Sequence, residues 1–227
     1  LWFSLVLLTG LCTTSGVSAK EPVVHDYKFG EGITLASPTG HQLRISGYVQ
    51  PYLETKSYTD DGDSEYYHRF RLRRLRLRLS GRAPQHKISY RLQVDLSGAT
   101  ETDAETSDFL MDAFVAYHVT KRIKLTIGQR STFTDNRELF VRSHTLQLVE
   151  RSRVTSSFAA IREFGLFAEG RFRLGPSGQY IKPYFVLTNG DGPNVFGNDR
   201  GGLKVGGRLD YLPFGLFYNM GQVREVD

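Results

Sequence analysis

Residues 69–80 read RFRLRRLRLRLS and alternate basic with apolar side chains along almost their whole length. Successive side chains of a β-strand point to opposite faces, so this alternation predicts one basic and one apolar stripe. The alternation slips by one residue at Arg73-Arg74, and a β-bulge there keeps each stripe on its own face. A helix is excluded, because period two spreads the arginines around a 3.6-residue turn. The basic stripe, called the arginine ladder below, comprises Arg69, Arg71, Arg73, Arg74, Arg76 and Arg78.

A strand with these two stripes has two interpretations. It can belong to a soluble sheet whose outer face is basic. It can also cross a membrane within a barrel, with apolar residues toward lipid and polar residues toward a water-filled lumen. A row of cations along a confined lumen would attract anions. The rest of the chain distinguishes these interpretations.

The first residues predict a secreted protein. Residues 1–19 carry no charge and end in Val17-Ser18-Ala19, a signal-peptidase-like site. We interpret them as a signal peptide whose start is missing, because the apolar run is shorter than the roughly 20 residues of a spanning helix. Cleavage after Ala19 removes Cys12, the only cysteine, and with it any disulfide or thiolate metal site. The formal net charge of +5 favours anionic partners without identifying one.

Period-two segments recur along the chain, and the connections between them alternate in length. After a loose lead-in over 20–40, strands are predicted over 43–54, 69–80, 88–97, 109–119, 123–127, 166–174, 180–188 and 203–210, with a ninth beginning after 215. Met111 is placed on the apolar face of the fourth of these. The connections at 57–65, 98–107, 129–163 and 189–200 are long, and those at 81–86, 120–121, 175–179 and 211–215 are short. Outer-membrane barrels have short turns at one end and long loops at the other. The pattern therefore predicts an all-β, transmembrane, antiparallel up-and-down β-barrel.

Several segments also carry a family resemblance. In chain order they are RFRLRRLRLRLSG (69–81), YRLQVDLSG (90–98), MDAFVAYHVTKRIKLTIGQ (111–129), VERSRV (149–154), REFGLFAEGRF (162–172) and TNGDG (188–192). As an ordered set they resemble the phosphate-selective porin O and P family of bacterial outer membranes. The resemblance implies a sixteen-stranded, trimeric barrel with an aqueous channel. It also implies that the third external loop folds inward and narrows the pore, and 129–163 is the third long connection.

The resemblance sets the expected domain organisation. Residues 1–19 are the signal peptide, 20–40 the lead-in and 41–227 the N-terminal part of the barrel, with 129–163 as the inward loop. The chain would hold about 8–9 strands, and an open half-barrel exposes unpaired edges to lipid, so we interpret it as a fragment of a longer porin.

Two sets of arginines are candidate site residues. The arginine ladder is the candidate anion path. The candidate constriction residues of the inward loop are Arg130, Arg137, Arg142, Arg151 and Arg153, with Arg162 at its end. By resemblance, phosphate-selective members have lysines at the constriction. No lysine occurs here between Lys124 and Lys182, so selectivity for phosphate over chloride stays open.

Structural roles are the alternative for both sets. Ladder arginines can pair with Glu54, Asp95 and Asp112 on neighbouring strands, and loop arginines can pin the loop to the wall, as through Arg162 and Glu163. The six histidines show no metal-ligand spacing, and no phosphate loop, dinucleotide fingerprint or nucleophile elbow is present. We therefore expect no enzyme, no catalytic residue, no cofactor and no metal.

The sequence thus predicts an outer-membrane channel through which small anions diffuse along an arginine-lined lumen. Phosphate and chloride are the expected anions, phosphate by resemblance. Outer-membrane lipid and a homotrimer are the expected partners, and nucleic acid is not. Two alternatives stay open, namely a non-conducting barrel that acts as adhesin or scaffold and a secreted β-sheet protein that binds polyanions. Conductance and solubility without detergent distinguish them.

Overall fold

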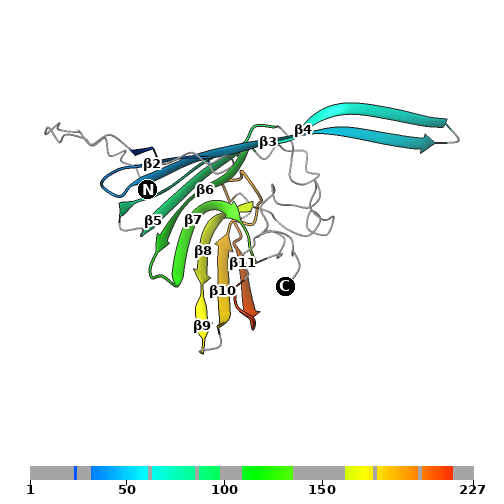
Figure 1. The fold of residues 1–227 in the computed structure, drawn as a ribbon. Helices are drawn as coiled ribbons and strands as arrows, with labels where there is room; N and C mark the ends of the chain where they lie inside the picture. Colours follow the sequence, from blue (N-terminus) through cyan, green and yellow to red (C-terminus); the bar gives the residue numbers. More distant parts are fainter. Residues whose placement is uncertain are drawn as a thin grey trace.

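The computed structural model describes residues 23–24, 32–60, 63–84, 87–97, 109–134, 162–175, 178–198 and 201–216. These residues form one open, antiparallel sheet that curves strongly (Figure 1). The order across it is β1-β2-β3-β4-β5-β6-β7-β8-β10-β11, with β9 beside β10, so the strands follow one another as in sequence. Within these ranges no helix is long and apolar enough to cross a membrane. The predicted all-β, antiparallel up-and-down sheet is confirmed.

The strand bounds match most of the predicted segments. The strands are β1 Val23–Val24, β2 Ile33–Ala36, β3 Gln42–Asp60, β4 Asp63–Arg82, β5 Ile88–Asp95, β6 Leu110–His118, β7 Ile123–Ser131, β8 Arg162–Gly170, β9 Phe172–Leu174, β10 Gln179–Thr188 and β11 Lys204–Leu212. β8 and β9 continue one another past Arg171, whose N–H donates to the Arg122 carbonyl at 2.9 Å. Together they are the single strand expected over 166–174.

The predicted β-bulge lies in β4. Gln50 of β3 pairs with Arg74, whereas the next residue, Pro51, pairs with Leu72, so Arg73 is the extra residue. A bulge of this kind accommodates one inserted residue without turning the rest of the strand over. The basic and apolar stripes therefore continue in phase along the whole of β4.

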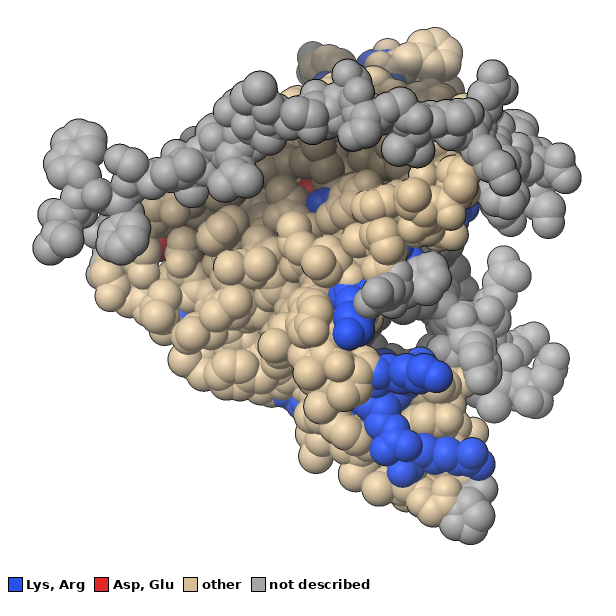
Figure 2. Space-filling view, turned by 90° about the vertical axis from the view of Figure 1, so that its left-hand side faces the viewer, with Lys and Arg blue, Asp and Glu red and all other residues tan. Residues whose placement is uncertain are grey.

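The two faces of the sheet differ in polarity in the way a membrane barrel requires. The face that carries the ladder is called the inner face here, and the opposite one the outer face. On the outer face, Val49, Leu125, Leu166 and Val205 are between 47% and 65% exposed. Buried side chains among the described residues are instead mostly polar, twelve against five apolar ones. A soluble domain shows the reverse. The view in Figure 2 is dominated by uncharged residues, with Lys and Arg gathered near one edge.

Two expected loops are shorter than predicted. Residues 57–65 were expected to form a long acidic loop, but β3 runs to Asp60 and β4 starts at Asp63. Tyr58, Thr59, Tyr66 and Tyr67 favour strands and continue the pairing past the acidic residues, and the hairpin extends beyond the rest of the sheet (Figure 1). The inward loop expected over 129–163 is shortened by β7, which ends at Ser131, and by β8, which begins at Arg162.

Two further expectations need correction. The lead-in over 20–40 is not loose throughout, because β2 pairs with β3 and β1 pairs with β2. Met111 does not face outward with Val115. The register of β5 with β6 shifts between Gln93 and Val94, which makes Met111 the extra residue of a second bulge. Met111 is fully buried there, and the Gln93 side-chain amide contacts its sulfur at 3.3 Å.

Candidate functional site

The register of β3 with β4 places five of the six ladder arginines on one face. Arg69, Arg71, Arg74, Arg76 and Arg78 lie opposite Glu54, Tyr52, Gln50, Tyr48 and Ser46. These partners alternate along β3, so their side chains share a face, and directly opposite residues of antiparallel strands share that face too. Arg73 is the exception, because it is the bulge residue.

Carboxylates hold three of the ladder arginines. Arg69 Nε lies 2.5 Å and Arg71 Nη1 3.6 Å from the carboxylate of Glu54. Arg76 Nε donates to Asp95 at 2.7 Å, and its Nη1 donates to the Tyr48 hydroxyl at 3.1 Å. The pairing alternative considered for the ladder therefore holds for these three arginines.

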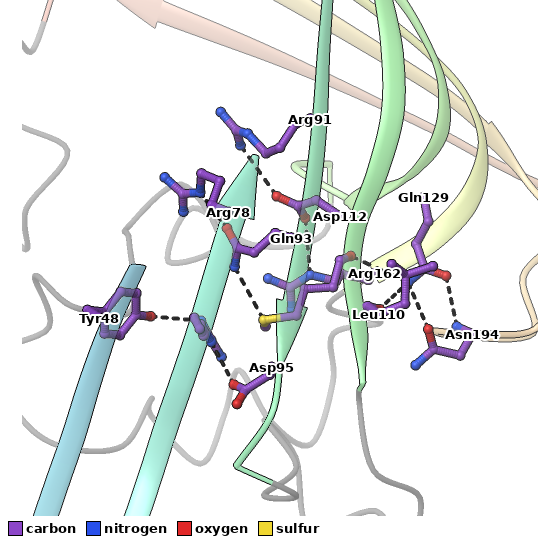
Figure 3. Close-up of polar contacts among 12 residues, drawn as sticks. Tyr48, Arg78, Arg91, Gln93, Asp95, Leu110, Asp112, Gln129, Arg162 and Asn194 are labelled. Carbon is purple, nitrogen blue, oxygen red and sulfur yellow. Dashed lines mark hydrogen bonds and ion pairs between the residues drawn. The ribbon is translucent and has the colours of Figure 1, made fainter. Parts of the chain in front are cut away.

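Glutamines orient two others. Arg74 Nη1 donates to Gln50 Oε1 at 2.7 Å. Arg78 Nε donates to Gln93 Oε1 at 2.6 Å, and this contact is drawn in Figure 3. An amide oxygen fixes a guanidinium without adding a negative charge, whereas a carboxylate adds one. Gln50 and Gln93 therefore order the ladder while preserving its positive potential.

Burial along the ladder is graded. Arg74 and Arg76 are only 2% and 5% exposed, whereas the side chains of Arg69 and Arg71 are 53% and 44% exposed. The exposed pair lies toward the projecting hairpin, and the buried pair lies beside β5. Water screens the first pair strongly and the second much less.

Asp112 contacts two arginines outside the ladder. Its two oxygens contact Arg91 Nη1 at 3.4 Å and Arg162 Nε at 3.3 Å (Figure 3). Asp112 lies opposite Gln93 of β5, and β5 separates it from the ladder strand β4. Arg162 is thus joined to the wall through Asp112.

Arg130 was expected in the constriction loop, but it belongs to β7 and is only 6% exposed. It forms an ion pair with Glu169, to which Lys124 also binds at 2.8 Å. Its guanidinium lies 4.5–5.4 Å from the ring centres of Phe114, Phe133 and Phe167. Cation–π contacts and a carboxylate enclose Arg130, which makes it part of the wall. Arg137, Arg142, Arg151 and Arg153 lie outside the described residues.

A further ion-pair group joins the last strands. Lys204 Nζ lies 3.2 Å from Glu163, which also accepts a hydrogen bond from the Thr188 hydroxyl. In β11, Arg208 Nε donates to Asp210 at 2.7 Å. The inner face is therefore charged across its whole width.

Cations outnumber carboxylates on this face. From the registers, its cations in β3 to β11 are Arg44, Lys56, Arg69, Arg71, Arg74, Arg76, Arg78, Arg82, Arg91, Lys124, Arg130, Arg173, Lys182, Lys204 and Arg208. The carboxylates with described side chains are Glu54, Asp95, Asp112, Glu163, Glu169 and Asp210. The surplus gives the described part of this face a positive potential.

Sequence reasoning missed several of these residues as members of the site. Glu169, Lys204 and Arg208 lie on the polar stripes of their strands, so alternation indicates their face. Their partnerships had no local signal, because Arg130 and Glu169 are 39 residues apart and Lys204 and Glu163 are 41. Among the described residues, no three His, Cys, Asp or Glu side chains lie together as a metal site would require.

Comparison with known proteins agrees with this geometry. The model of the family "Phosphate-selective porin O and P" matches residues 54–180, more than half of the chain. The chain belongs to this family. The porins of this family are bacterial outer-membrane channels and not enzymes. No curated protein matches the chain. In this porin, the family match runs from the end of β3 into β10 and includes every ladder arginine.

Proposed function

We propose that this porin lets small anions diffuse across the bacterial outer membrane along the inner face of the sheet. The observation that carries the proposal is the surplus of cations on that face, opposite an outer face of exposed apolar side chains. An apolar exterior and a polar interior are the arrangement of a membrane barrel with an aqueous lumen. Phosphate and chloride are the anions proposed.

The ladder suits passage better than tight binding. Two unit charges about 4 Å apart interact by roughly 1 kcal/mol in water and by about 4 kcal/mol at an effective dielectric of 20. Successive cations whose interaction energy with an anion lies between these two values attract the anion without trapping it. The carboxylates Glu54 and Asp95 weaken the potential beside Arg69, Arg71 and Arg76.

Phosphate is proposed as the preferred anion on the family name and on the chemistry of arginine. The guanidinium forks onto two oxygens of an oxyanion, a geometry that chloride cannot offer. The proposal further includes a signal peptide over 1–19, an inward external loop within 129–163 and assembly as a homotrimer in outer-membrane lipid. Arg137, Arg142, Arg151 and Arg153 are proposed to face anions at the narrowest point.

A reversal potential tests the proposal. The porin is inserted into planar bilayers under a KCl gradient, unmodified and with Arg71, Arg74 and Arg76 changed to Ala. Arg122→Ala, at an exposed turn, removes one charge outside the proposed path and serves as the control. We expect anion preference that weakens in the triple variant and is unchanged in the control. Cation preference in the unmodified porin would falsify anion conduction, and absence of conductance would favour the scaffold alternative.

A further inference from the structure

A histidine lies on the inner face, at the end of the sheet where the short turns are. His118 is the last residue of β6 and lies opposite Lys124 of β7, one of the inner-face cations. Directly opposite residues of antiparallel strands share a face. Of the other described histidines, His41 precedes β3 and His68 lies with Phe70 on the outer face. Within the part of the chain that the structure describes, His118 is therefore the inner-face histidine.

The imidazole of His118 is held by a contact that suits both of its protonation states. Its Nε2 atom lies 3.1 Å from Ser89 Oγ, and its main-chain N–H donates to the Lys87 oxygen at 2.7 Å. A hydroxyl can donate to a nitrogen of a neutral imidazole and can accept from an imidazolium. Gain or loss of a proton therefore requires only rotation of the Ser89 hydroxyl, and the ring keeps its place.

The charged groups nearest to His118 are mostly cations. Lys124 is its partner on β7, and Arg82 of β4 lies opposite Ser89. Glu169 of β8 is bound to Lys124 at 2.8 Å. Among the described residues, no carboxylate forms an ion pair with His118 itself. The other charged groups on this side are exposed cations of the adjoining turns, namely Lys87, Lys121 and Arg122. A proton on His118 thus adds a positive charge that no described carboxylate pairs with.

We propose that His118 makes the anion preference of the porin depend on pH, with the strongest preference when its imidazole is protonated. The inference rests on the proposed channel function, because it concerns how strongly that channel selects anions. Histidine ordinarily titrates between about pH 5 and pH 8, whereas Asp, Glu, Lys and Arg side chains ordinarily keep their charge in that range. As the pH falls through this range, the new charge adds to the surplus of cations on the inner face. As the pH rises, that contribution is lost.

The size of the effect follows from the distance over which one charge acts. A unit charge about 10 Å from the ions, screened at about 0.1 M salt, favours chloride over potassium about twofold, because it attracts one ion and repels the other. Chloride is the suitable probe, since it carries one charge at every pH.

Reversal potentials under a KCl gradient between about pH 5 and pH 8 test the inference. His118→Gln keeps this position neutral, and His118→Arg keeps it charged. His68→Gln, which removes a histidine from the outer face, is the matched control. We expect the ratio of chloride to potassium permeability in the unmodified porin to rise about twofold as the pH falls. His118→Gln should hold the lower value at every pH, His118→Arg the higher value, and His68→Gln should follow the unmodified porin.

The possible outcomes separate this inference from the channel function. An equal rise in His118→Gln overturns the inference, because another group then carries the response. A low ratio at every pH in both His118 variants also overturns it, because the ring would then act only through the structure. A ratio independent of pH in an unmodified, anion-selective porin overturns the inference and leaves the channel function standing. Cation preference or absence of conductance at every pH overturns the proposed function, and the inference falls with it.

Discussion

At the scale of single residues, the partner of each ladder arginine decides how much positive potential it contributes. Gln50 and Gln93 bind Arg74 and Arg78 through neutral amides. Gln50→Glu and Gln93→Glu would keep the geometry and add a negative charge at each contact. We expect anion preference to decrease in each variant and to decrease further in the double variant. Reversal potentials measure it, with Gln179→Glu at the far end of β10 as control. Preference that survives in the double variant would remove Arg74 and Arg78 from the path.

Asp95 has the opposite effect on Arg76. Both side chains are almost fully buried, and the carboxylate also accepts hydrogen bonds from the Ser97 hydroxyl and main chain. Removing one partner of a buried pair typically costs about 3–5 kcal/mol, because the remaining charge is left in a poor solvent. We therefore expect Asp95→Asn to lower the stability of the porin and to strengthen its anion preference.

Urea unfolding in lipid vesicles and reversal potentials check the two effects of Asp95→Asn separately. Lower stability with unchanged selectivity would mean that the pair is purely structural. Leu77→Asn, on the outer face of the same strand, tests whether any polar change in β4 alters selectivity, and no change is expected there.

At the scale of elements, the face of the strand on which a charge is introduced should decide how much the free energy of unfolding decreases. Leu77 is 43% exposed on the outer face, whereas Ser80 lies on the inner face between Arg44 and Arg91. An arginine on the lipid face of a barrel costs about 2–4 kcal/mol at the bilayer midplane, while a charge toward the lumen stays hydrated. Leu77→Arg should therefore destabilise the folded porin by about that amount, and Ser80→Arg by much less. Equal losses in urea unfolding would contradict this assignment of faces.

The alternation of the strands explains which elements could be predicted. Period two places side chains on faces, so the ladder, its bulge at Arg73 and the apolar outer face followed from the sequence. It does not mark where pairing stops, which is why the hairpin beyond Glu54 and the start of β8 at Arg162 were missed. β2 was missed because Ile33–Ala36 is too short to display a period.

The partnerships within the site could be predicted only in part. Glu54 and Asp95 could be assigned to the ladder from the sequence. Each lies on the polar stripe of a strand next to β4, and adjacent antiparallel strands bring side chains of the same face together. The contact of Asp112 with Arg162 was not predicted, because the two residues are 50 positions apart in the sequence. Arg130 was expected to contact anions, because its cage of three rings assembles from three different parts of the chain and has no local signal in the sequence.

At the scale of the whole molecule, the proposed channel would select ions through the summed field of its inner face rather than at one binding site. The Debye length falls from about 10 Å at 0.1 M salt to about 3 Å at 1 M, so distant cations stop acting together as salt rises. We expect the ratio of chloride to potassium permeability to decrease as the mean KCl concentration rises at a fixed gradient. A ratio independent of salt would indicate selection at one narrow contact instead.

The bulge at Arg73 has a consequence for how β4 tolerates the loss of a codon. Deleting Leu77 or Arg78 would turn every later residue of the strand over and direct arginines into lipid. Deleting Arg73 would instead leave RFRLRLRLRLS, which alternates without interruption and needs no bulge. Deletion of this one residue therefore keeps every later side chain of β4 on its own face, whereas other single-residue deletions exchange the two faces. In a library of single-residue deletions across β4, we expect the variants that still fold and insert into the membrane to be those that lack Arg73 or Arg74, which leave the same sequence.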